Sequence, residues 1–479
     1  MSKKVVIEPV TRIEGHAKIT ISLDPKGEVE DVRFHVTEFR GFEEFCKGRL
    51  VWEMPSLTAR TCGICPVSHL LASAKAGDGV MGVTIPPNAV RLRRIANLAQ
   101  IIQSHALSFF HLSAPDFLLG MDSDPATRNV FGLMAANPEL ARRGIRLRGF
   151  GQSVIEAIAG RKVHSPGIVP GGIANPMSEE TRSRLLEGLP EARETAAAAI
   201  EVFVEILEKH PREAQSFGNF PSMFMALSNE TGTWEHYDGR LKMIDAKGGV
   251  VVEGVDPRDY RTIIGEASRP DSYLKSPYFK PKVGEKGKPE EGMYRVGPLA
   301  RVNMAESMGS PDGDAALAAF RERAGGVALS SFFYHYARLV EILTATEQME
   351  LALKNDNVLD PMVRAQAGVN QLQAVGVSEA PRGTLFHEYR VDPHGILEDV
   401  NMIIATGQNN LAMNATVTQI AKEWIDGPKI PEGVLNRIEA GIRAFDPCLS
   451  CSTHATGQMP LSVTMLSSDG MVLDQVIRN

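Results

Sequence analysis

Cysteine is scarce in this chain, since only five of its 479 residues are cysteines. So low a count excludes a scaffold held together by disulfides and favours a reducing compartment. The N-terminus carries two lysines but only a three-residue apolar run before Glu8, which is too short for the core of a secretory signal. We therefore expect the protein to be cytoplasmic.

Long apolar runs and a large excess of one charge are also missing. No stretch reaches the about 18 uninterrupted apolar residues that a membrane-spanning helix needs, so we expect no membrane span. The net charge of -7 and the pI near 6.0 give no electrostatic reason to expect a nucleic acid or an anionic membrane as partner. Small molecules and other proteins are the partners that the composition favours.

The residues that are present suit a folded protein with a sizeable core, because 43% are hydrophobic and 23% are charged. The length fits about two to four average domains or one large unit. Alternating apolar residues predict strands at 5–8, 16–23, 29–37, 241–244, 249–253 and within 384–405. Apolar residues at helical spacing predict helices at 87–112, 178–210, 314–355, 409–425 and 431–443.

The fold class expected from these elements is α+β, predominantly α, with a long-helix core and small N-terminal and central β-sheets. We expect residues 1–479 to form a single domain. Its predicted parts are an N-terminal β region (1–40), a helical core (87–210), a β-containing excursion (211–300), a second helical stretch with a C-terminal metal motif (301–454) and a C-terminal extension (455–479).

Four of the five cysteines form two Cys-x-x-Cys pairs, Cys62 with Cys65 and Cys448 with Cys451. That spacing lets two thiolates hold one metal ion, and two pairs together predict a four-thiolate site. A structural zinc site or an iron-sulfur site has the same ligands, so the pairs alone leave those alternatives open. The fifth, Cys46, is interpreted as a free buried thiol without a role.

The residues around the pairs carry a resemblance to a known family. The segments are Arg-Ile-Glu-Gly-His at 12–16, Phe-Arg-Gly-Phe-Glu at 39–43, Arg-Thr-Cys-Gly-Ile-Cys-Pro-Val-Ser-His at 60–69 and Asp-Pro-Cys-Leu-Ser-Cys-Ser-Thr-His at 446–454. Further matching segments lie at 272–278, 294–300 and 380–383. In this order they resemble the large, catalytic subunits of nickel-iron hydrogenases, most of all the soluble bidirectional NAD-reducing subgroup.

The resemblance implies an enzyme that reversibly cleaves H2 heterolytically into protons and electrons. Cys62 and Cys448 are then expected to be terminal nickel ligands. Cys65 and Cys451 are expected to bridge nickel and an iron that carries one CO and two CN ligands. The Cys448 thiolate is a suitable base for the proton that the cleavage releases.

Further residues take expected roles from the same motifs. Glu14 is the candidate for passing the proton onward, whereas a solvated glutamate at a strand end is the alternative interpretation. Arg382 is expected to overhang the metal site and to donate to cyanide or substrate, with Asp446 as its partner. Without the motifs, a surface arginine and a turn aspartate would be the ordinary interpretations of these two residues.

Two residues are expected to support the metal ligands. His69 is expected to hydrogen-bond a bridging cysteine sulfur, and a satisfied core histidine is the alternative. Thr406 is the candidate for a bond to a cyanide.

A magnesium ion beside the active site is also implied, held by the Glu43 carboxylate, His454 and a main-chain carbonyl, which we place at Met402. Oxygen ligands of this kind suit a hard cation. A solvated pair of charges at Glu43 and Glu44 is the competing interpretation. The chain departs from many respiratory members at 103–105, where it reads Gln-Ser-His and lacks one carboxylate of the usual canopy over the metals.

The resemblance implies partners as well. Four of the five cysteines belong to the expected metal site, so the chain has no cysteine cluster to bind an iron-sulfur relay. An iron-sulfur small subunit is therefore expected to carry the electrons away. No Gly-x-Gly-x-x-Gly fingerprint follows a strand, so NAD chemistry would belong to diaphorase subunits. Residues 455–479 lie where a maturation protease removes an extension in this family, although they also read as a β-hairpin that stays in the fold. A metal-free relative within a larger complex, a hydrogen sensor and a non-catalytic zinc or iron-sulfur scaffold are the rival functions.

Overall fold

A computed structural model describes residues 3–427, 429–453, 461–466 and 472–478. The chain begins with the antiparallel sheet β1 (Lys3–Ile7), β2 (Ala17–Leu23) and β3 (Val29–Val36), as the sequence predicted. Alternate residues of β2 are buried, among them Ile19 and Ile21, which explains why the alternation was legible in the sequence.

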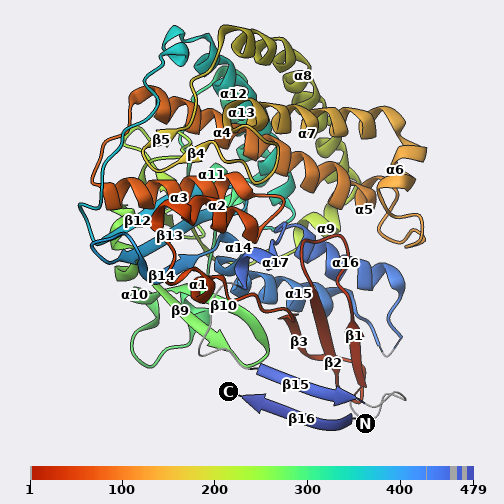
Figure 1. Ribbon diagram of the computed structural model, residues 1–479. Coiled ribbons are helices and arrows are strands. Elements are labelled where there is room, and N and C mark those ends of the chain that lie inside the picture. Colours follow the sequence, from red (N-terminus) through yellow and green to blue (C-terminus); the bar gives the residue numbers. More distant parts are fainter. Residues whose placement is uncertain (1–2, 428, 454–460, 467–471, 479) are drawn as a thin grey trace.

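Long helices form the upper part of the molecule in Figure 1. They are α3 (Pro66–Met81), α4 (Pro87–Ala106), α7 (Pro138–Ala159), α8 (Glu179–Lys209), α12 (Pro311–Ala324) and α13 (Phe333–Lys354). The predicted start of α8 is confirmed, because the Ser178 side chain accepts a hydrogen bond from the Thr181 amide. Glu179 and Glu180 occupy the first turn, where their negative charges interact favourably with the positive end of the helix dipole.

The single helix predicted over 314–355 is wrong, because two helices occupy that range. α12 ends at a left-handed Gly325 with φ +70°, and Gly326 follows at φ +114°. Glycine adopts such angles without steric cost and ends helices, so the glycine pair reverses the chain before α13. The helix predicted to run to residue 112 also changes form, since a π-helical segment, Leu107–Ser113, follows α4.

The remaining strands form small sheets below and beside the helices (Figure 1). One sheet has the order β11 (Tyr294–Arg295), β6 (Met223–Ser228), β7 (Arg240–Ile244), β8 (Val250–Val255), and another has β12 (Gln373–Ala380), β13 (Gly383–Val391), β14 (Leu397–Ile403). Two-stranded sheets pair β4 (Ile168–Val169) with β5 (Gly172–Ile173), β9 (Ile264–Arg269) with β10 (Ser272–Phe279), and β15 (Leu461–Leu466) with β16 (Val472–Arg478). The predicted strands near 241, 249 and 384–405 are confirmed.

Short helices complete the described chain. They are α1 (Phe42–Cys46), α2 (Met54–Thr58), α5 (Ala114–Leu118), α6 (Val130–Ala136), α9 (Pro211–Ser216), α10 (Lys280–Val283), α11 (Pro298–Met304), α14 (Ala405–Gln408) and α17 (Leu449–Ser452). The predicted helices at 409–425 and 431–443 correspond to α15 (Asn410–Trp424) and α16 (Glu432–Arg443). No described helix is long and apolar enough to cross a membrane.

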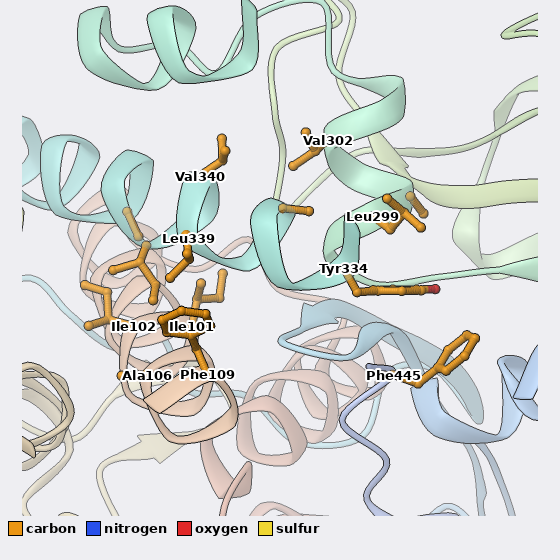
Figure 2. Packing of buried hydrophobic residues seen from close by; sticks show 14 of the residues in the cluster. Ile101, Ile102, Ala106, Phe109, Leu299, Val302, Tyr334, Leu339, Val340 and Phe445 are labelled. Carbon is orange, nitrogen blue, oxygen red and sulfur yellow. The ribbon is translucent and has the colours of Figure 1, made fainter. Parts of the chain in front are cut away.

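The main core lies where α4, α11 and α13 meet. Figure 2 shows Ile101 and Ile102 of α4 close to Leu339 of α13. The ring of Tyr334, at the start of α13, lies 4.9 Å from the ring of Phe445 between their centroids. Because Phe445 directly precedes the last cysteine motif, this packing anchors that motif on the rigid helical core.

Candidate metal centre

The first cysteine pair lies between two helical segments. Cys62 ends a short 3-10 turn, Ala59–Thr61, and Cys65 is the N-cap of α3, with Pro66 in the first helical turn. The Cys62 sulfur accepts hydrogen bonds from the amides of Ile64 and Cys65 at 3.2 and 3.3 Å. Two amide donors on one sulfur stabilise its thiolate form, and thiolates are what bind metals.

The second pair also lies at the start of a helix, α17, but one turn further into it. Cys448 is its N-cap and Cys451 lies within it. The chain enters through Asp446 in a left-handed conformation at φ +51°, which is uncommon for any residue other than glycine. The Cys448 amide donates to the Thr406 hydroxyl at 2.9 Å, so α14 also holds this pair.

The four sulfurs meet in the interior, although almost the whole chain separates the pairs. Cys62 and Cys448 Sγ lie 3.2 Å apart, Cys65 and Cys451 Sγ 3.6 Å apart, and Cys448 and Cys451 Sγ 2.8 Å apart. All four sulfurs lie within 4.8 Å of one another, and all four residues are buried. Among the described residues this is the only cluster of three or more such side chains able to hold one ion.

The thiols of this cluster differ in acidity. Hydrogen bonding with Cys448 lowers the pKa of Cys62 well below its usual value and lowers the pKa of Cys65 to about 6. Burial raises the pKa of Cys448 and that of Cys451 well above the usual value.

Arg382 lies beside the cluster and is almost fully buried. Its Nε donates to the Asp446 carbonyl, and its Nη2 lies 3.0 Å from Asp446 Oδ2 in an ion pair. Neither Nη1 nor Nη2 makes a well-aligned hydrogen bond to any residue that the structure describes. Burial lowers the pKa of Arg382, but Asp446 and then Cys448 outweigh it, so the pKa is raised well above its usual value. A charged, buried guanidinium therefore presents unused donors next to the four sulfurs.

The unused donors of Arg382 indicate which kind of metal centre fits the site. A plain four-thiolate zinc site satisfies its ligands without any further donor. Buried polar groups nearly always have a partner, so a buried guanidinium whose Nη1 makes no hydrogen bond to any described residue predicts an acceptor beside the four sulfurs. Cyanide on iron is such an acceptor, and the donor set of Cys62, Cys65, Cys448, Cys451 and Arg382 fits that group.

Glu14 is tied directly to the second cysteine pair. Its backbone forms a parallel bridge with Cys448, and its carbonyl accepts from the Leu449 amide at 3.1 Å. Its carboxylate accepts from the Ser450 amide at 3.0 Å. Glu14 is thus a partly buried residue locked beside Cys448, which is not the environment of a freely solvated strand-end glutamate.

His69 lies one helical turn beyond Cys65 on α3, so both face the same side of the helix. Its Nδ1 lies 3.1 Å from His387 Nε2. His387 Nδ1 lies 2.7 Å from the Tyr389 hydroxyl, which donates to Ser73 at 2.9 Å. A buried chain of hydrogen bonds therefore orients the His69 ring.

The residues expected to hold magnesium are brought together in part. Glu43 in α1 is buried, and its Oε1 accepts from the Met402 amide at 2.8 Å. Burial raises the pKa of Glu43. The Thr453 carbonyl accepts from the amides of Arg40 and Gly41, both at 3.1 Å, so the chain ends its last motif close to Glu43. His454 lies outside the described residues.

The departure at 103–105 has a structural counterpart that the sequence did not reveal. Gln103 donates to the Ile64 carbonyl at 2.6 Å, and Gln100 donates to the same oxygen at 2.9 Å. Two amides of α4 thus hold the loop between Cys62 and Cys65. Glutamines at helical spacing are common on solvated faces, so only their burial could have pointed to this role.

A network of buried charges behind Arg382 was also missed. Arg301 donates to Glu341 at 2.6 and 2.7 Å, to Glu379 at 2.8 Å and to the Pro381 carbonyl at 3.1 Å. His105 lies 2.8 Å from Glu341 through its Nε2. These contacts fix the segment that carries Arg382. Cys46, the fifth cysteine, is buried apart from the cluster, and burial raises its pKa to about 12.

Two protein-family models match the chain. One, described as HoxL-like, matches residues 4–39. The other, described as nickel-dependent hydrogenase, matches residues 40–128 and 230–454. Both cysteine pairs and Arg382 fall within the second match, and Glu14 falls within the first.

Known relatives match over their full length. The NAD-reducing hydrogenase HoxS subunit beta of Cupriavidus necator is 42% identical, with 100% of both chains covered. The corresponding chain of the F420-non-reducing hydrogenase of Methanothermobacter thermautotrophicus is 40% identical, with 99% of this chain and 100% of that protein covered.

Solved structures confirm the expected α+β fold. A crystal structure of an NAD+-reducing NiFe hydrogenase in its H2-reduced state matches with a TM-score of 0.91 at 44% identity, over 94% of this chain and 99% of that one. The Ni-Fe-Se hydrogenase from D. vulgaris Hildenborough has a TM-score of 0.75 at 24% identity, over 95% of this chain and 100% of that one.

Proposed function

The chain belongs to the nickel-dependent hydrogenase family, and on this premise we propose that it is the catalytic subunit of an NAD-reducing nickel-iron hydrogenase. Its reaction is the reversible heterolytic cleavage of H2 into protons and electrons. The observation that carries the proposal is a buried cluster of four cysteine sulfurs beside a guanidinium with unused donors. Similarity along the whole chain to the beta subunit of HoxS supports NAD as the final acceptor.

The four cysteines would hold nickel and an iron with one CO and two CN, with Cys62 and Cys448 as ligands of nickel alone and Cys65 and Cys451 as ligands shared by both metals. The spacing of the sulfurs supports one compact centre, with both bridging candidates 3.6 Å apart. When bound, such a pair supplies the Lewis-acid and redox chemistry that cleaves H2.

Cys448 Sγ would take up the proton released in the cleavage, and the Glu14 carboxylate would receive it from there. The Glu14 backbone pairs with that of Cys448, and the Ser450 amide holds one carboxylate oxygen, so the other oxygen can exchange a proton by a small side-chain rotation. Efficient proton transfer requires donor and acceptor to be held in a fixed relative position, which the backbone pairing of Glu14 with Cys448 supports.

Arg382, whose Nη1 makes no hydrogen bond in the described chain, would donate to cyanide or substrate, and Asp446 fixes the guanidinium plane. Thr406, whose oxygen already accepts from the Cys448 amide, has its hydroxyl hydrogen to donate to a second cyanide. His69 orients a bridging sulfur, with His387 holding the other side of its ring.

We further propose a magnesium ion held by Glu43, the Met402 carbonyl and His454. A buried carboxylate whose pKa is raised by burial gains from a neighbouring cation, which supports Glu43 as a ligand. The ion would join α1, β14 and the end of the last cysteine motif, and thereby close the site.

Electrons leave through an iron-sulfur small subunit, from which they reach NAD on diaphorase subunits. With four of five cysteines in the metal cluster and Cys46 buried elsewhere, the chain has no ligands for its own relay. We place the complex in the cytoplasm and residues 1–479 in a single domain. A maturation protease would remove residues 455–479, a stretch that contains the β15–β16 hairpin.

The proposal is tested by H2-dependent NAD+ reduction with the purified complex, together with exchange of D2 with water. Replacement Cys451→Ser should abolish both activities, whereas Cys46→Ser should leave both within twofold. Exchange without steady turnover would favour the hydrogen sensor. Zinc in place of nickel, with no exchange, would favour the non-catalytic scaffold and overturn the proposal.

A further inference from the structure

One buried carboxylate outside the metal site, Asp116 in α5, pairs with three arginines. Two of them, Arg12 and Arg443, each precede a residue of the proposed proton path, and the third, Arg128, lies farther away at 3.7 Å. Its side chain is 1% exposed. Its Oδ1 pairs with Arg12 Nη2, and its Oδ2 lies 3.0 Å from Arg443 Nη1. Asn436 also donates to Oδ1 at 3.1 Å. No role for Asp116 follows from the metal-site motifs.

The first arginine fixes the segment that leads into Glu14. Arg12 has a left-handed backbone at φ +55°, a conformation that is sterically unfavourable for a residue with a side chain. It persists where surrounding contacts over-determine it. Here the Arg12 side chain donates to the Leu112 carbonyl at 2.6 Å as well as to Asp116. Two anchors thus hold the backbone two residues before Glu14.

The second arginine fixes the segment that leads into Cys448. Arg443 is the last residue of α16, and its carbonyl accepts from the Asp446 amide at 3.0 Å. Its Nε donates to the Thr11 carbonyl and its Nη2 to the Thr11 hydroxyl, both at 2.9 Å. Arg443 therefore touches the Glu14 segment as well as Asp116, and the three groups form one closed network.

We propose that Asp116 is a positioning residue that sets the separation between Cys448 and Glu14 by holding Arg12 and Arg443 at the same time. This inference rests on the proposed function, in which a proton passes between those two residues. Asp116 is the anion that Arg12 and Arg443 share, whereas Glu439 pairs with Arg443 at 3.2 Å and accepts from the Thr11 amide. Without the Asp116 charge the two guanidinium groups would lose their common partner and repel each other. Each guanidinium carries a segment of the proton path with it.

The size of the effect follows from the geometry. Misplacing reacting groups by about 1 Å can lower a rate about 100-fold. We expect binding of H2, a small neutral substrate, to be unaffected. Loss of Asp116 should therefore lower kcat and leave KM for H2 unchanged. Proton transfer should also become rate-limiting, which raises the solvent deuterium isotope effect.

The test uses the complete complex with Asp116→Asn, which keeps the side-chain shape and removes the charge. We expect nickel content within about 20% of the wild type, about a tenfold or greater fall in kcat, KM for H2 within twofold, and a larger solvent isotope effect. The matched control is Asp122→Asn. Asp122 also pairs with an arginine of α16, Arg437, at 2.7 Å, but its side chain is 72% exposed. The control should match the wild type in all four measurements.

Two further variants keep the inference falsifiable. Arg12→Lys retains the charge but loses one of the two anchors, and it should reproduce the rate and isotope effects even where Asp116→Asn fails to load nickel. Glu14→Gln tests the proposed function separately. In a Glu14→Gln background, Asp116→Asn should lower the rate no further, because it acts through Glu14.

The outcomes separate the two claims. If Glu14→Gln is impaired while loaded Asp116→Asn, or Arg12→Lys, has wild-type kcat and isotope effect, the positioning role is overturned and the proton path stands. If Asp116→Asn lowers kcat by the same factor in the Glu14→Gln background as in the wild type, Asp116 acts elsewhere, and the inference is also overturned. If Glu14→Gln has no effect, the proton path itself is wrong.

Discussion

Gly15 directly follows Glu14 and lies against the second cysteine pair. Its φ is +87°, and an added Cβ would lie 2.7 Å from the Leu449 Cβ. Gly15→Ala should therefore both strain the backbone and push Glu14 away from α17. We expect the free energy of unfolding to fall by about 2–4 kcal/mol, and nickel content to fall with it.

Gly48 provides the matched control for that prediction. It has a similar φ of +78°, but nothing lies within 4 Å of an added Cβ. Gly48→Ala should cost only the backbone strain, about 1 kcal/mol, and should leave nickel content unchanged. Thermal unfolding and metal analysis of both variants test this prediction. Equal losses of stability and of nickel in the two variants would mean that the close contact with Leu449 is not what makes Gly15 important.

Arg382 gives the second prediction at this scale. Lysine carries the same charge but lacks the planar fork, so Arg382→Lys cannot hold Asp446 and donate to a cyanide together. We expect H2 oxidation to fall by about 100-fold or more, with nickel retained and the cyanide stretching bands shifted. Arg390→Lys on β13, the strand that follows Arg382, is the control, because Arg390 is half exposed and pairs with Glu398. Unshifted bands with a normal rate would remove Arg382 from the site.

The residue scale also shows the limit of sequence reasoning. Motif positions pointed to the four cysteines, Glu14 and Arg382, and the structure brings these residues together. Asp116 and Arg301 gave no signal, because a charged residue within a helical pattern ordinarily belongs to a solvated face. Only the fold reveals that they are buried and paired.

At the scale of elements, α4 contacts His236 in the loop between β6 and β7, and this contact makes stability depend on pH. The Asn97 amide of α4 lies 3.1 Å from His236 Nδ1. Burial lowers the pKa of His236 to about 3, from an ordinary value near 6.5. Between these values the unfolded chain binds a proton that the folded chain excludes. His236 therefore contributes stability above pH 6.5, and that contribution is lost as the pH falls toward 3.

His236→Gln removes this titration while leaving an amide oxygen to accept from Asn97. The loss of stability on acidification from about pH 6.5 to about pH 4 should become shallower by up to about 1.4 kcal/mol per pH unit. Unfolding midpoints of the complex measured across this range give the slope. The exposed His394→Gln is the control and should keep the wild-type slope. An unchanged slope in His236→Gln would show that His236 is not neutral in the fold.

Elements with one buried and one exposed face were predictable, as β2, β3, α8 and α15 illustrate. α3 was not, because nearly all of its residues are buried and no polar face marks its period. β12 could not be predicted for the same reason, because its residues from 376 to 380 are buried on both faces and show no alternation of apolar and polar residues. The Gly325-Gly326 pair could have marked the break between α12 and α13. Apolar residues at helical spacing on both sides of the pair instead led to the prediction of one continuous helix.

At the scale of the whole molecule, the C-terminal extension gives a prediction about maturation. The structure pairs β15 with β16, so the predicted hairpin is present in the full-length chain. If residues 455–479 are removed after nickel loading, intact mass spectrometry of the active complex should show a large subunit that ends at His454. An intact chain in active enzyme would show instead that the hairpin is a permanent part of the protein.

The central claim is that the four buried sulfurs hold nickel and an iron with CO and CN ligands. The most direct measurement is metal analysis of the purified complex combined with infrared spectroscopy in the carbonyl and cyanide stretching region. We predict nickel and iron in equal amounts at the centre, one carbonyl band and two cyanide bands. Zinc with no bands in that region would contradict the claim and make the site a structural one.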